Sequence, residues 1–110
     1  MFKIPYSKMD LQIASLGINT KVEADPEFES KFISTVEKFS FPAEDKMKKV
    51  AEHIGITLEV LVASPNMDKL IEQFDDHVIR ELIDALQSLG FTHKEAFAFI
   101  VLGLYSNLLD

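Results

Sequence analysis

The stretch MDKLIEQFDDHVIRELIDALQSL, residues 67–89, decides the fold class of this chain. Its large apolar residues recur at intervals of three and four positions, the spacing that places side chains on one face of an α-helix. The predicted buried seam consists of Leu70, Ile71, Phe74, Val78, Leu82, Leu86 and Leu89, widened by Ile79, Ile83 and Ala85. Gly90 follows directly, as glycine commonly does at a helix end. The sequence therefore predicts one long amphipathic helix.

Helix start and stop signals recur on both sides of this segment. Ser7 and Gly17 predict a short first helix between them, and we expect residues 18–24 to be extended or a loop. Further helices are predicted over residues 26–39, 43–54, 57–63 and 92–109, each next to an N-cap residue or a proline. Because no stretch alternates with a period of two, no strand is predicted. The expected fold is all-α, a compact bundle of five to six helices in one domain over residues 1–110.

Two of these predicted helices have distinctive apolar patterns. In the helix over residues 26–39 one stripe faces inward, formed by Phe28, Phe32, Ile33, Val36 and Phe39. The last helix contains AFAFIVLGLY, residues 96–105, which is apolar around its whole circumference. It is either a central helix surrounded by its neighbours, or one side of it, with Phe97, Ile100 or Leu104, is covered by a second chain. The second alternative predicts a self-assembling accessory protein that forms a homodimer through this helix.

The composition is that of a globular protein and excludes several kinds of chemistry. The 110 residues are 47% apolar and 26% charged, values typical of one folded domain. The absence of cysteine excludes disulfides, zinc–thiolate sites and thiol nucleophiles. The start of the chain lacks the apolar run of a signal peptide, and residues 96–104 are about half as long as a membrane span. We therefore expect a cytoplasmic protein that does not enter the membrane.

The net charge of −7 is confined to the second half of the chain. Residues 1–50 carry eight lysines and eight acids, whereas residues 51–110 carry three basic residues and ten acids. Six of these acids lie on the polar side of the predicted long helix: Asp68, Glu72, Asp75, Asp76, Glu81 and Asp84. Such a face either only keeps the helix solvated, or it attracts a basic partner and accelerates their encounter.

The leading hypothesis is a non-catalytic protein-binding protein, a small acidic inhibitor or immunity-type protein. It would dock a basic protein partner through the six acids of the long helix. Apolar residues near Phe91, or in the short helix from Leu58 to Val62, would add to the contact. The analogy with toxin-neutralising immunity proteins and phage-encoded inhibitors rests on size, charge and fold class alone.

The residues that remain for catalysis or metal binding are few. His77, Glu81 and Asp84 lie at i, i+4 and i+7 on one helix face, but a metal site would need further ligands from a second helix. His53 and His93 fall near predicted helix ends, where the helix dipole or capping explains them. The sequence has no glycine-rich phosphate loop and no hydrolase or metalloprotease motif. We expect no enzymatic activity, no cofactor and no metal.

Residues 46–65 contain a second candidate for function. In KKVAEHIGITLEVLVASP, residues 48–65, Ala51 and Gly55 stand four positions apart, and Val50, Ile54, Ile56 and Leu61 supply the flanking apolar positions. With this spacing the stretch resembles bacterial repressor-type helix-turn-helix segments, and the resemblance implies a DNA-binding regulator.

The side chains of this stretch argue against nucleic acid. Base-reading helices present Arg, Lys, Gln, Asn or Ser, whereas the second helix here offers Glu59 among apolar residues. Lys46, Lys48 and Lys49 on the preceding helix are the basic residues that would contact a phosphate. DNA binding therefore remains the alternative to protein binding.

Overall fold

The computed structural model describes residues 3–104, without the side chains of Ala43 and Glu44. Six α-helices follow one another: α1 Lys8–Ala24, α2 Pro26–Lys38, α3 Ala43–Ile54, α4 Leu58–Ala63, α5 Met67–Leu89 and α6 His93–Phe99. A π-helical turn over Ile100–Leu104 continues α6. No strand occurs within residues 3–104. The predicted all-α fold with its number of helices is confirmed.

Capping interactions explain where several of these helices begin and end. The hydroxyl of Ser7 accepts a hydrogen bond from the Asp10 N–H at the start of α1, and the hydroxyl of Thr57 accepts one from the Val60 N–H at the start of α4. Gly55 and Gly90 end α3 and α5 with φ values of 86° and 116°, a conformation that is strained for other residues. These signals were readable from the sequence because they are local.

The first helix is longer than the sequence predicted. Residues 18–24 are neither extended nor a loop but form the last turns of α1, and Gly17 lies inside the helix. The physical reason is a close tertiary contact, because a Cβ atom at Gly17 would collide with Oε2 of Glu95 in α6. The glycine thus allows α6 to approach α1. From the sequence alone, a glycine with this role cannot be distinguished from one that ends a helix.

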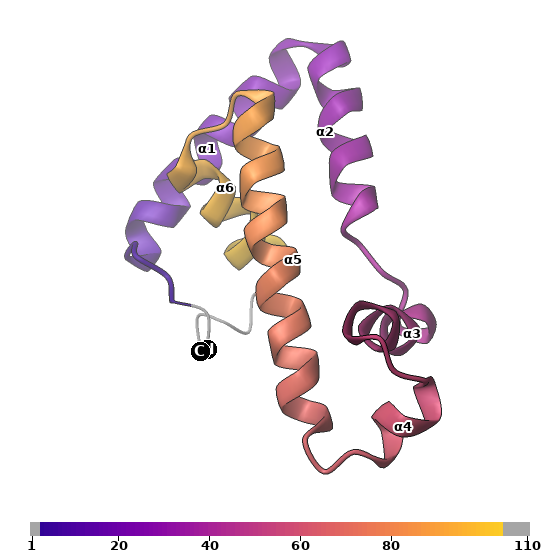
Figure 1. Cartoon of the computed structure of the whole chain (residues 1–110). Helices are drawn as coiled ribbons and strands as arrows, with labels where there is room; N and C mark the ends of the chain where they lie inside the picture. The colour runs from indigo at the N-terminus through magenta and orange to yellow at the C-terminus, as the bar shows by residue number, and fades with distance from the viewer. Residues whose placement is uncertain (1–2, 105–110) are drawn as a thin grey trace.

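Helix α5 is the spine of the molecule and packs against different neighbours along its length (Figure 1). Its second half belongs to a large core cluster with α1 and α6: Leu11, Ile18, Ile79, Leu82, Ile83, Leu86, Phe91, Ala96, Phe97, Ala98, Ile100 and Val101. Its first half belongs to a small core cluster with α3 and α4: Val50, Ala51, Leu61, Phe74 and Val78. The molecule is therefore elongated along α5, with extents of 47 × 30 × 19 Å.

Helix α2 packs against the large cluster through aromatic side chains, and the residue after it reaches both clusters. The ring of Phe32 lies 5.3 Å from that of Phe91 and 4.9 Å from that of Phe99, centroid to centroid. Phe39, just after α2, packs against both core clusters. Ile33 differs from the prediction that it faces inward, because its side chain is nearly half exposed. The contacts of α2 with the core are thus carried mainly by phenylalanines, whose large area stabilises a narrow contact.

Among the helices of residues 3–104, none combines sufficient length with sufficient apolar character to span a membrane.

Candidate functional site

The six acids predicted as a binding face do not form one continuous surface on α5. Asp68, Glu72 and Asp76 are spaced by four residues and form one row along the helix, which we call the acidic stripe. At about 100° per residue, Glu81 and Asp84 lie roughly 150° around the helix from this row. The division follows from the helical repeat, and both sides are at least partly exposed because the buried face of α5 moves by roughly a third of a turn between the two core clusters.

Asp75 has a structural partner on another helix. The Nζ atom of Lys46 in α3 lies 3.1 Å from Oδ1 and 3.3 Å from Oδ2 of Asp75, and both side chains are partly buried. This ion pair fastens α3 to α5 within the small cluster. Asp75 is thus engaged inside the chain, and Lys46, one of the three lysines considered for phosphate binding, is engaged with it.

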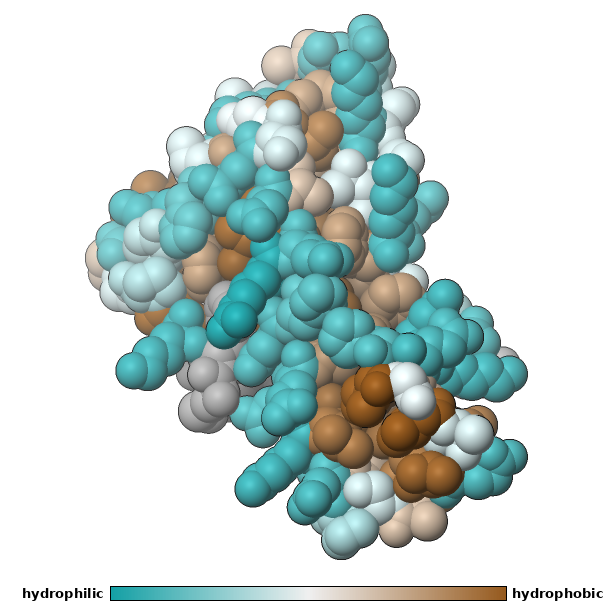
Figure 2. All heavy atoms as spheres, viewed as in Figure 1, coloured by the Kyte–Doolittle hydropathy of each residue, from teal (hydrophilic) through white to brown (hydrophobic). Residues whose placement is uncertain are grey.

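Exposed apolar side chains occur in α4 and at the end of α3. In α4, Val60 and Val62 are 54% and 59% exposed, and Ile54 at the end of α3 is 36% exposed. We call these three residues the α4 apolar patch, although at 100° per residue Val60 and Val62 lie roughly 160° apart around α4, one on each side of the exposed Glu59. Figure 2 shows hydrophobic atoms gathered at this end of the molecule, over α3, α4 and the start of α5. Phe91, the other apolar candidate, is buried in the large cluster and is not available to a partner.

The segment over residues 46–65 has the predicted order of helix, glycine turn and helix. Val50, Ala51 and Leu61 are buried, as the resemblance to a helix-turn-helix implies. The second helix, α4, is only six residues long and exposes Glu59 together with Val60 and Val62. Base reading requires hydrogen-bonding side chains on this helix, and the described α4 presents none that donates.

The histidines take part in local contacts. Nε2 of His77 lies 3.1 Å from Oε1 of Glu81, and the ring of His53 lies 4.5 Å from that of His77. Asp84, the third member of the predicted row, is not part of this pair. His93 shares a hydrogen bond of 2.6 Å with the Tyr6 hydroxyl. Within residues 3–104 no three His, Asp or Glu side chains are grouped as metal ligands.

The described part of the last helix, residues 93–104, packs mostly within its own chain, and the predicted continuation to residue 109 lies outside the described residues. Phe97 and Ile100, two of the three residues considered for a dimer interface, are buried in the large cluster, whereas Leu104 is exposed. A second copy would reach Phe97 and Ile100 only if the core opened. Of the two alternatives for this helix, the described residues match the central helix, and any interface through Leu104 would be a narrow one.

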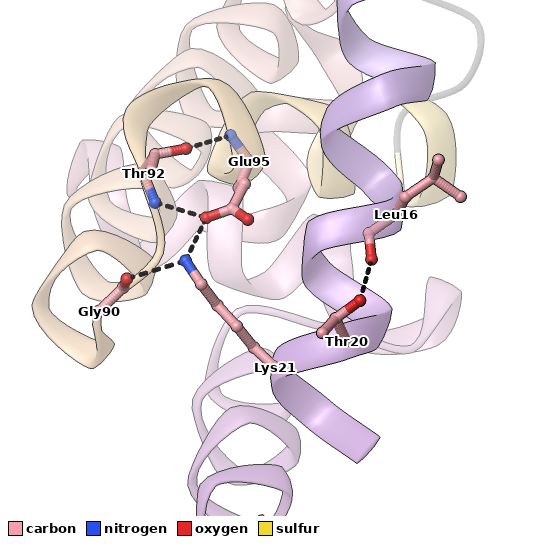
Figure 3. Close-up of polar contacts among 6 residues, drawn as sticks. All are labelled: Leu16, Thr20, Lys21, Gly90, Thr92 and Glu95. Carbon is pink, nitrogen blue, oxygen red and sulfur yellow. Dashed lines mark hydrogen bonds and ion pairs between the residues drawn. The ribbon is translucent and has the colours of Figure 1, made fainter. Parts of the chain in front are cut away.

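One polar network of the large cluster was not predicted (Figure 3). Nζ of Lys21 in α1 lies 2.5 Å from Oε1 of Glu95 in α6 and donates to the Gly90 carbonyl oxygen at 3.2 Å. Glu95 also completes the predicted capping box with Thr92. Burial alone raises the pKa of the Glu95 carboxyl, but the hydrogen bonds and charge of Lys21 and the bonds from Thr92 outweigh it and hold the pKa below its usual value.

Comparison with known proteins gives no relative from which a function could be transferred. No protein-family model matches this chain, and no characterised protein or solved structure is significantly similar to it. The functional assignment therefore depends on the surface described above.

Proposed function

We propose that this protein is a non-catalytic binding protein that docks a basic protein partner, with inhibition of that partner as its specific role. The observation that supports the proposal best is the exposure of Val60 and Val62 in α4, the helix that directly precedes the acidic α5 in the chain. Val60 and Val62 are each more than half exposed in a helix of which only Leu61 is buried in the core. Surface of this kind, next to charged residues, is characteristic of a protein-binding site.

The two parts of this surface have different physical roles. The α4 apolar patch supplies the desolvated centre from which most of the affinity of a protein interface comes. The acidic stripe supplies attraction over a distance, because residues 51–110 carry three basic residues against ten acids. A partner that fits both parts has an apolar contact surrounded by lysines or arginines, and its association rate falls as salt is added.

DNA binding remains the alternative, favoured only by the order of helix, glycine turn and helix in α3 and α4. It predicts a shift of DNA in a low-salt gel that is lost when Lys48 and Lys49 are both changed to Glu. Capture of a protein in the experiment below, without such a shift, decides for protein binding.

Capture of a partner from an extract of the source cell tests the proposal with matched variants. Asp68→Lys combined with Asp76→Lys reverses the acidic stripe, and Val62→Asp places a charge in the α4 apolar patch. We expect both variants to lose a basic protein that the unchanged chain retains. Asp75 stays unchanged, because its ion pair with Lys46 is structural.

The control lies on the other side of the same helix. Glu81→Lys combined with Asp84→Lys changes the net charge by the same amount as the stripe variant but leaves the stripe intact, so capture should persist. The proposal fails if the unchanged chain captures no protein at any salt concentration, or if the stripe and control variants behave alike.

A further inference from the structure

Helix α1 carries an apolar row that nothing in residues 3–104 covers. Met9, Ile13 and Leu16 are 70%, 62% and 66% exposed. Their spacing of four and three residues places them on one face of α1, opposite the buried Leu11 and Ile18. Single exposed apolar residues are ordinary on a protein surface, but three in a row on one helix form a contact surface.

The polar residues around this row are suited to burial against another helix. Gln12 and Thr20 are uncharged, and the Thr20 hydroxyl already donates to the Leu16 carbonyl oxygen at 3.0 Å within α1 (Figure 3). Covering Thr20 therefore leaves its hydroxyl donor paired. A donor left without an acceptor is the usual cost of burying a polar group.

The charges of α1 indicate what covers the row. Lys8 and Glu23 lie on the same flank at opposite ends of the helix, and neither makes an ion pair with another described side chain. In an antiparallel pair of helices related by a two-fold axis, the same side of the helix from each copy lies at the contact. The N-terminal end of one helix then lies beside the C-terminal end of the other. Lys8 of each copy then faces Glu23 of the other.

We propose that the α1 row of Met9, Ile13 and Leu16 binds a second copy of this chain, forming a two-fold symmetric, antiparallel α1–α1 dimer. Net charge supports this location, because residues 1–50 balance eight lysines with eight acids. Two copies of a chain with net charge −7 repel each other least where their neutral halves meet. The interface differs from one through the last helix, in which Phe97 and Ile100 are already buried.

The size of the contact sets the strength of the dimer. A helix of 17 residues is about 25 Å long, and pairing two such faces buries on the order of 1,000 Å² in total. This area is at the lower end for specific interfaces, so the dimer dissociates at concentrations of tens of micromolar, as an order of magnitude.

Sedimentation equilibrium of the full chain from about 5 to 500 µM, a range that brackets the expected dissociation constant, tests the proposal. We expect the mass to rise from that of a monomer to that of a dimer, and Ile13→Asp to abolish the rise. Ile33→Asp on α2 and Val62→Asp on α4 are controls of similar exposure and should dimerise like the unchanged chain. A monomer at every concentration overturns the proposal, and so does a dimer that Val62→Asp removes.

A charge exchange tests the antiparallel geometry without touching the apolar row. Lys8→Glu alone or Glu23→Lys alone replaces two attractive pairs with two repulsive ones and should weaken the dimer by roughly tenfold. Mixing the two single variants restores opposite charges at both pairs, so the mixed dimer should form as readily as the original. If mixing restores nothing, the two-fold antiparallel arrangement is wrong.

Discussion

Glu95 is a charged residue in a buried position, and its carboxylate has partners on two sides. It accepts a hydrogen bond from the Thr92 N–H at 2.9 Å, which caps α6, and it pairs with Lys21, which fastens α1. Lys21 in turn reaches the Gly90 carbonyl oxygen, one of the acceptors left unpaired at the end of α5. One carboxylate therefore links three helices, and its removal affects all of them.

Replacing Glu95 with alanine should lower the free energy of unfolding by about 1–3 kcal/mol, because it leaves partners of a part-buried charge unpaired. Urea unfolding followed by circular dichroism measures this effect. Glu81→Ala removes an exposed polar contact with His77 and serves as the control, with an expected loss of less than about 1 kcal/mol. Equal losses for both variants would mean that the network in Figure 3 adds nothing to an ordinary surface pair.

The lowered pKa of Glu95 predicts the direction of a pH dependence. A carboxyl whose pKa is lower in the folded than in the unfolded state stabilises the fold above the unfolded pKa of about 4.3. This contribution disappears as the pH falls through the folded pKa. The difference in unfolding free energy between the unchanged chain and Glu95→Gln should therefore be full at pH 6 to 7, as an approximate range, and shrink on acidification below about 4. A difference that grows toward acid pH would contradict this assignment.

Gly17→Ala tests the close approach of α6 to α1. Alanine favours a helix over glycine by about 1 kcal/mol, so an unconstrained site would become more stable. Here the new Cβ collides with Glu95, and moving that carboxylate disturbs its pair with Lys21. We expect Gly17→Ala to destabilise the unchanged chain but to stabilise the Glu95→Ala variant, both measured by urea unfolding. The same sign in both backgrounds would show that the two residues do not interact.

The capping box of Thr92 and Glu95 was predictable because its two residues are three positions apart. The partner of Glu95 was not, because Lys21 lies 74 positions away and was placed in a loop or extended segment. Gly17 led to that error, since a glycine that ends a helix and one that admits a neighbouring helix look alike in a single sequence. Interactions between residues close in the sequence were therefore predictable in this chain, whereas contacts between distant helices were not.

At the scale of the helices, periodicity predicted α5 well but not the division of its polar face. The apolar residues of α5 were identified as one seam, whereas Phe74 and Val78 pack with α3 and α4, and Leu82 and Leu86 pack with α1 and α6. A change of partner along a helix moves its exposed face as well. The six acids were predicted as one face, but the step of about 100° per residue already places them on two sides of the helix, and the moving buried face leaves both sides at least partly exposed.

Helix α4 depends on a single buried side chain. It is six residues long, too short to be stable in isolation, and Leu61 is its one fully buried residue. Leu61→Ala should cost about 2–5 kcal/mol and remove the protection of α4 amides from hydrogen exchange. Val62→Ala, one position further and mostly exposed, should change stability by no more than about 0.5 kcal/mol. Retained α4 protection in Leu61→Ala would mean that other contacts hold this helix.

At the scale of the whole molecule, the two core clusters differ greatly in size. The large cluster joins buried residues from α1, α5 and α6, while the small cluster joins a few from α3, α4 and α5. The radius of gyration of 15.5 Å exceeds the value of about 13 Å for a compact domain of this length. Composition and periodicity predicted one helical domain, but they contain no information on how a core is distributed along its longest helix.

This unequal distribution predicts that the α3–α4 end opens before the rest of the molecule. Opening the small cluster exposes five buried residues, whereas opening the large cluster exposes twelve, so it costs less apolar burial. Native-state hydrogen exchange should give Ala51 and Leu61 amides an opening free energy at least about 1 kcal/mol below that of Leu82 and Ala96. Phe74→Ala should widen this difference, because Phe74 belongs only to the small cluster.

Equal opening free energies with equal urea dependence would instead show a single cooperative unit, coupled through α5 and through Phe39. In that case a partner bound at the α4 apolar patch would stabilise α1 and α6 as much as α4 itself, whereas separate opening confines its effect to the end that it contacts.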